Sequence, residues 1–223
     1  MKTTIKTILI TVALLLGIGA NAQNNPLVLG VKAGVNLSNF SGNGADGMDA
    51  KVGFNVGLTV DYALSEELYL LSGLELTMKG AKDKGFISFT EPTLGTVSFE
   101  GTEKDNPMYL QIPVHLGYKI AVMDGTKVIL HAGPYVAYGI GGKSKVKGSV
   151  ISEDEEIFID TDFDFFGKDR AKRFDFGLGL GAGFEFGKTA VGLGYDFGLV
   201  NMFDNSTYTV KNMNAYLTLG YKF

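Results

Sequence analysis

The chain contains two histidines, His115 and His131, and they have the clearest potential for chemistry. Each lies on the polar side of a segment in which apolar and polar residues alternate. Pairing Ala121 with Lys127 across the intervening turn sets the register of the two segments. In that register His115 and His131 are diagonal neighbours on one face, about 7–8 Å apart between their Cα atoms. Two imidazoles beside a carboxylate could bind a metal ion or exchange protons.

The remaining parts of a catalytic site are not evident in the sequence. There is no Gly-x-Ser-x-Gly motif or other nucleophile arrangement, and no Cys for a thiolate metal site. We therefore predict a protein that is not an enzyme and that holds no metal or cofactor. An enzyme that uses the two histidines is the less favoured alternative.

Charged residues share the polar side of the alternating segments with the histidines. Acids and bases are mixed, and charges enclosed by a protein need partners. We predict a paired polar network that fills the interior of the fold. Its members are Lys32, Glu75, His115, Lys119, His131, Asp175, Glu185 and Asp196, with Asp61 and Lys79 on the same side.

Segments with a period of two must position these side chains, because alternation of this kind indicates β-strands. The clearest begins at Met213, where every second residue up to Phe223 is apolar and the others are polar or small. The pattern recurs about eight times, and no helical periodicity is evident in the mature chain. The predicted strands are residues 29–38, 52–62, 68–79, 108–120, 127–140, 174–186, 189–200 and 213–223.

The connections between the predicted strands alternate between short and long. This asymmetry is typical of outer-membrane barrels, which have short periplasmic turns and longer external loops. We therefore predict an all-β fold, an eight-stranded antiparallel up-and-down transmembrane β-barrel. Ten strands are the alternative if hairpins within the long loops join the barrel.

Alternation alone does not say which face of the barrel points outward. A soluble lipocalin-like barrel would place its apolar side chains inside. Two features favour the membrane: the polar face is rich in glycine, which makes room in a narrow interior, and the apolar stripes end in aromatic residues. Side chains can fill an eight-stranded barrel, so a conducting pore is a minor alternative.

The first residues have the features of an export signal. Lys2 and Lys6 precede an apolar run at 8–20, and Ala20-Asn21-Ala22 is a small-x-small cleavage pattern. We predict a signal peptide at 1–22, cleaved between Ala22 and Gln23, and a barrel domain at 23–223. A retained anchor helix is disfavoured because the run is short. The formal net charge of −4, without a basic cluster, argues against a nucleic-acid partner.

Two long loops contain patterns of their own. The D-x-D-x-D spacing of 160–164 is similar to a calcium loop, but Phe165 stands where that loop needs glycine and no glutamate follows at the required spacing. A hairpin that extends strands 127–140 and 174–186 past the membrane, with the basic arm 143–147 facing the acidic one, is the preferred interpretation. Residues 86–100 also alternate and predict a second external hairpin.

Several segments resemble the PorT-like outer-membrane β-barrel family of Bacteroidetes and, more widely, small OmpA-like barrels. The resemblance implies outer-membrane lipid as the surroundings and insertion by the barrel-assembly machinery, with Phe223 as the assembly signal. The namesake branch serves protein secretion, which makes an accessory subunit of a secretion or transport complex the alternative to a structural or interaction role through the external loops. The matching segments are residues 30–38, 109–119, 133–143, 175–186, 195–202 and 217–223.

Overall fold

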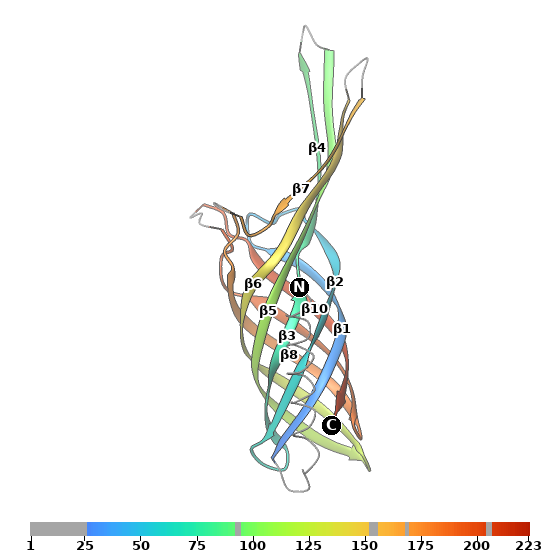
Figure 1. The fold of residues 1–223 in the computed structure, drawn as a ribbon, viewed down its shortest axis with the longest axis vertical. Coiled ribbons are helices and arrows are strands. Elements are labelled where there is room, and N and C mark those ends of the chain that lie inside the picture. The colour runs from blue at the N-terminus through green and yellow to red at the C-terminus, as the bar shows by residue number, and fades with distance from the viewer. Residues whose placement is uncertain (1–25, 92–94, 152–155, 168–169, 204–206) are drawn as a thin grey trace, which may run out of the picture.

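The computed structural model describes residues 26–91, 95–151, 156–167, 170–203 and 207–223. Its ten strands belong to one antiparallel sheet (Figure 1). The predicted signal peptide, with Ala22 and Gln23, lies outside the described residues. None of the described residues forms a helix that is long and apolar enough to cross a membrane. The strands are β1 (Leu27–Ser41), β2 (Asp49–Ala63), β3 (Leu68–Met78), β4 (Ala81–Glu91), β5 (Gly95–Met123), β6 (Thr126–Ile151), β7 (Glu156–Asp164), β8 (Phe174–Phe186), β9 (Thr189–Gly198) and β10 (Lys211–Lys222).

Eight of these strands close into a ring. Its order is β1, β2, β3, β5, β6, β8, β9, β10, and β10 pairs again with β1. Closure satisfies the backbone hydrogen bonds within the ring, which a β-structure in lipid requires. The predicted eight-stranded antiparallel barrel is confirmed.

The barrel carries its apolar side chains on the outside and its polar ones inside. Leu193 and Leu219 expose 62% and 59% of their surface, whereas Asn36 and Lys79 expose 2% and 0%. A soluble barrel has the opposite arrangement, so that alternative is wrong. Outward aromatic residues lie near both ends of the apolar band, as at membrane interfaces. They include Tyr62, Tyr118, Phe174, Phe186, Phe197 and Tyr221.

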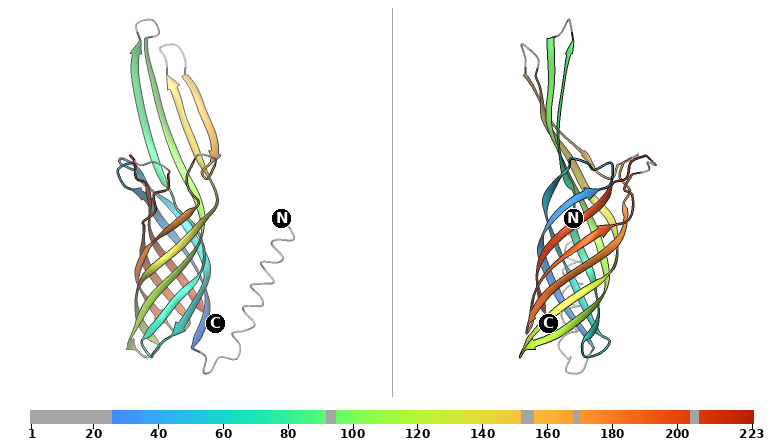
Figure 2. Two further views of the ribbon diagram at one scale, coloured as in Figure 1. Left: turned by 90° about the vertical axis from the view of Figure 1, so that its left-hand side faces the viewer. Right: turned by 180° about the vertical axis from the view of Figure 1, so that it is seen from behind.

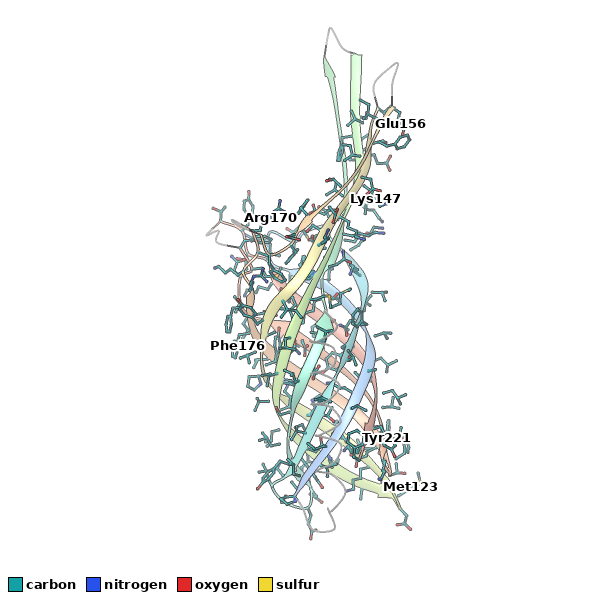
Figure 3. The ribbon with its side chains drawn as sticks, in the orientation of Figure 1. Met123, Lys147, Glu156, Arg170, Phe176 and Tyr221 are labelled. Atoms are coloured by element: carbon teal, nitrogen blue, oxygen red, sulfur yellow. The ribbon has the colours of Figure 1, made fainter. Side chains whose placement is uncertain are left out.

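The two ends of the barrel differ. At the end that holds the chain's C-terminus, short turns join the strands, and Gly125 and Gly187 adopt positive φ angles of 72° and 56° there (Figure 2). Met123 and Tyr221 mark this periplasmic end in Figure 3. The long connections gather at the opposite, external end.

A four-stranded sheet projects from the external rim (Figures 1 and 2). Strands β5 and β6 stay paired beyond the barrel as far as Ser98 and Ile151, β4 pairs along β5, and β7 pairs along β6. We call this the external sheet: β4, residues 95–106 of β5, residues 143–151 of β6, and β7. In the described residues β7 pairs with β6 alone and β4 makes two residue pairs with β2, so neither enters the ring and the ten-stranded alternative is wrong.

Both predicted external hairpins are present in this sheet, with one correction. The basic and acidic arms face each other, with Lys147 paired to Asp160 at 2.7 Å and Lys143 paired to Asp162. The hairpin extends β6 but not β8, because the chain leaves the ladder after Asp164 and turns back over the barrel mouth.

An apolar cluster closes the external mouth of the barrel. Phe165 stacks on Phe40 with ring centroids 6.2 Å apart, and Phe166 meets the ring of Tyr109 edge-on at 5.4 Å. Met202 and Tyr109 expose 1% and 0% of their surface. The lumen below is therefore separated from the external solvent by packed side chains.

Candidate functional site

The lumen holds most of the predicted site residues, in three layers along the barrel axis. The layer nearest the periplasmic turns consists of two lysines and two carboxylates. Lys119 Nζ lies 2.7 Å from Asp61 and 3.3 Å from Glu185, and Lys222 Nζ lies 2.6 Å from Asp61 and also contacts Glu185. Every charge in this layer thus has two opposite neighbours, which offsets the cost of removing it from water.

The layer nearest the external mouth is built around one buried ion pair. Lys79 Nζ and Asp175 Oδ2 are 3.4 Å apart, and their side chains expose 0% and 1%. Asp175 also accepts hydrogen bonds from the Tyr135 hydroxyl at 3.2 Å and the Asn212 amide at 3.0 Å. The Lys79 ammonium lies 4.3 Å from the centre of the Tyr135 ring, which adds a cation–π contact.

The middle layer surrounds a cavity of about 150 Å³. Lys32 pairs with Glu75 at 2.5 Å, and the Gln111 amide donates to Asp196 at 3.1 Å. Tyr216 also lines this cavity. The space is large enough for a few water molecules beside these polar groups.

The two histidines meet at the wall of this cavity. Their rings stack with centroids 5.1 Å apart, and the two Nδ1 atoms are 2.9 Å apart. The register that brings them together, with Gly117 opposite His131, is the one predicted from the turn. A hydrogen bond between two Nδ1 atoms requires one of them to lack a proton, so one ring donates and the other accepts.

This contact limits what the histidines can do chemically. Both Nδ1 atoms are used in the mutual hydrogen bond, and the buried Nε2 of His115 has no hydrogen-bond partner among the described residues. Nowhere in the described residues is a group of three or more His, Cys, Asp or Glu arranged to hold a metal ion. The arrangement is that of packed interior side chains.

The structure brings together some members of the predicted network and separates others. Lys32 meets Glu75, Lys119 meets Glu185, and His115 meets His131. Asp175 pairs with Lys79, which was predicted on the same side, and it also accepts hydrogen bonds from two residues that were not predicted, Tyr135 and Asn212. Asp196 accepts from Gln111, and Gln111 and Lys222 were likewise omitted from the prediction. All lie on the polar side of their strands, so strand parity was the signal that could have found them.

Phe223, the predicted assembly signal, ends the chain beside β1. Its amide donates to the Leu29 carbonyl at 2.9 Å, and its ring packs against Tyr221 with centroids 6.1 Å apart. The terminal aromatic residue therefore lies on the outside of the barrel at the periplasmic end, where 37% of its surface is exposed.

The closed ring, the outward apolar band and the asymmetric ends define a transmembrane β-barrel of the bacterial outer-membrane type. The chain matches the family described as "Outer membrane protein beta-barrel domain" over residues 21–204, and it belongs to that family. Its location is accordingly the bacterial outer membrane. No protein among the curated ones matches the chain.

Several solved structures are similar to this chain. The attachment invasion locus protein Ail of Yersinia pestis is 17% identical with a TM-score of 0.41, and the match covers 89% of this chain and 99% of that one. Neisserial surface protein A is 14% identical with a TM-score of 0.42, and the match covers 87% of this chain and 97% of that one. The translocator domain of the autotransporter NalP from Neisseria meningitidis is 14% identical with a TM-score of 0.30, and the match covers 100% of this chain and 98% of that one.

The face of the external sheet that continues the inner side of the barrel carries three acids. Asp83 and Glu103 are direct cross-strand partners, and Asp105 follows on the same face of β5. Burial raises the pKa of Asp105, although the hydrogen bond that the Ser144 hydroxyl donates to this carboxyl partly lowers it. Burial also raises the pKa of Glu103, and the charges of Asp105 and Asp83 add to the effect.

Mild acidification is expected to stabilise the external sheet. A carboxyl whose pKa is raised by folding binds its proton more tightly in the folded state, so stability increases as the pH falls through that raised pKa. Protection of the external sheet from protease should therefore increase as the pH is lowered from 7 toward the ordinary titration range of carboxyl groups. Asp105→Asn should show part of that protection already at neutral pH, and a sheet that becomes more protease-sensitive on acidification would contradict this account.

Proposed function

We propose that this protein is a non-enzymatic outer-membrane barrel that engages another molecule through its external sheet. The observation that carries the proposal is the continuity of β5 and β6 from the barrel into the external sheet. A binding surface built on strands that continue a membrane-anchored barrel is held more rigidly than one built on loops.

The lumen supports a structural role for the barrel itself. Its lysines pair with carboxylates, Asp196 accepts a hydrogen bond from Gln111, and its histidines bond to each other. Its external mouth is covered by the apolar cluster around Phe165 and Phe166. The Nδ1 atoms of both histidines are engaged in their mutual hydrogen bond, so the enzyme hypothesis has little support. The buried network is suited to rigidify the barrel.

The outer edge of the external sheet supports a role in binding. Strand β7 pairs with β6 along one side, and in the described residues its other side has no strand partner. Phe158 and Ile157 on β7 expose 78% and 58% of their surface. An exposed edge with apolar side chains is a surface to which an extended segment of another protein can add.

Site-specific photo-crosslinking in intact cells tests this proposal. A photoreactive amino acid would replace Phe158 on the external sheet, Leu193 on the lipid-facing band, or Asp124 in a periplasmic turn. We expect a discrete protein adduct from position 158, with lipid adducts from position 193 as the internal control.

The same experiment separates the proposal from its alternative, an accessory subunit of a secretion or transport complex, to which the PorT-like resemblance points. That alternative predicts defined protein adducts from positions 193 or 124, together with a large complex on native electrophoresis. Adducts confined to those two positions would overturn the external-sheet proposal.

A further inference from the structure

The outward face of the external sheet is rich in lysine. Along β5, Leu110 and Ile112 face lipid, and Lys104 lies on the same side because no residue is inserted in β5 between them. The lysines of β4 and β6 that pair with this part of β5 share the face. The set is Lys82, Lys84, Lys104, Lys143, Lys145 and Lys147, of which Lys147 is marked in Figure 3.

Lys104 occupies the centre of this group. It lies directly opposite Lys82 on β4 and Lys145 on β6. Its diagonal neighbours on the two adjoining strands include Lys84, Lys143 and Lys147. Among the described residues no carboxylate occupies any of these direct or diagonal positions.

The acids at the margins of the group are already engaged by other lysines. Lys84 pairs with Asp49 at 3.0 Å and its hydrogen bond lowers the pKa of that carboxyl. Lys143 does the same to Asp162. The described part of the chain provides no ion pair within 4 Å for the three lysines of the central row, which are Lys82, Lys104 and Lys145.

This row is unfavourable unless an anion binds to it. Like charges placed directly opposite one another destabilise a pair of strands. Here three lysines lie directly opposite one another on adjacent strands. The acids opposite the two outer lysines, Asp49 and Asp162, form their ion pairs with Lys84 and Lys143. A ligand with closely spaced negative charges would remove the repulsion and bind to several lysines at once.

The height at which the lysine-rich face begins indicates the source of the anion. Lys143 follows Ile140, the last exposed apolar residue of β6 in the barrel, by three positions, which is about 10 Å along the strand. With the usual strand tilt, the lysines begin roughly one headgroup layer above the hydrocarbon. Their long stems can lie along the strands and reach toward that layer.

We propose that Lys82, Lys104 and Lys145 form a binding site for the phosphate groups of an outer-leaflet lipid of the lipid A type. The site holds the base of the external sheet against the membrane surface. It does not depend on whether the free edge of that sheet has a protein partner.

Binding of defined lipids to the purified full chain in nanodiscs tests the site. The probes are bisphosphorylated lipid A, the same lipid without phosphates, and inorganic pyrophosphate in solution. The variants are Lys104→Gln alone and the triple variant K82Q/K104Q/K145Q. Two matched controls are K147Q/D160N, which keeps the charge of the sheet, and K127Q/K188Q, which removes lysines near the opposite end.

The wild type should prefer the phosphorylated lipid. The triple variant should lose roughly a hundredfold in affinity, since each lysine near an anionic surface contributes roughly fivefold. Lys104→Gln should show part of this loss while remaining at least as resistant to unfolding in lipid-free detergent, because the repulsion is reduced. Both controls should bind as the wild type does. Equal binding of the lipid without phosphates, or wild-type binding by the triple variant, would overturn the site. Lysine-dependent binding of pyrophosphate with no advantage for lipid A would overturn the lipid as its ligand.

Discussion

Asp175→Ala is expected to lower the free energy of unfolding by about 3–5 kcal/mol, because removing one partner of a buried ion pair leaves the other charge uncompensated. The Lys79 ammonium, which is fully buried, would lose its carboxylate, and Tyr135 and Asn212 would lose their shared acceptor. The chain has no Trp, so urea unfolding in detergent is best followed by far-UV circular dichroism and by the mobility of unboiled samples.

Two further variants show whether the loss of stability comes from the uncompensated charge of Lys79. Lys79→Met added to Asp175→Ala should recover part of the loss, since the unpaired ammonium is then gone. Asp160→Ala, which breaks an external pair with both side chains about two-thirds exposed, should leave the transition unchanged. An Asp175→Ala transition at the wild-type urea concentration would show that this pair does not stabilise the barrel.

The strands and their outward faces could be predicted because alternation is a local property. The bounds of β8, Phe174–Phe186, match the predicted segment residue for residue. The histidine pair could also be placed, since β5 and β6 meet across a short turn and their register follows by counting from it. In both cases the necessary information lies within a few tens of residues.

The partners across the lumen could not be predicted in the same way. Lys79 and Asp175 are 96 residues apart, and Lys222 and Asp61 are 161 apart. Which inward residues share a layer depends on the stagger of all the strands when the ring closes. Parity shows that a side chain points inward, but it does not say at what height the side chain meets another.

The external sheet is intermediate between these cases. Each hairpin was visible as a separate alternating pattern, but their union depends on β5 and β6 remaining paired above the barrel. A register shift beside Gly141 and Gly142 brings the β6 lysines to the outward side, and Gly142 adopts a φ of 136° there. A one-residue irregularity of this kind reverses the faces of everything beyond it.

Gly194→Ala is the second substitution with a large expected effect. Gly194 lies directly opposite Tyr216, and a Cβ atom at this position would be 2.4 Å from the Cζ and hydroxyl oxygen of that ring. Overpacking of this kind costs about 1–3 kcal/mol of unfolding free energy. Urea unfolding in the same detergent measures the loss.

The tyrosine ring itself is the obstacle, and this makes the prediction specific. In a Tyr216→Ala background the Gly194→Ala change should become neutral or mildly stabilising, because alanine restricts the unfolded chain more than glycine does. Gly220→Ala, whose nearest non-local contact is the Val31 carbonyl oxygen at 3.4 Å, should be tolerated in the wild type. If Gly194→Ala costs the same with and without Tyr216, backbone conformation is responsible for the loss. If the cost disappears with the ring, the inward glycines are required by the bulky side chains that fill this narrow lumen.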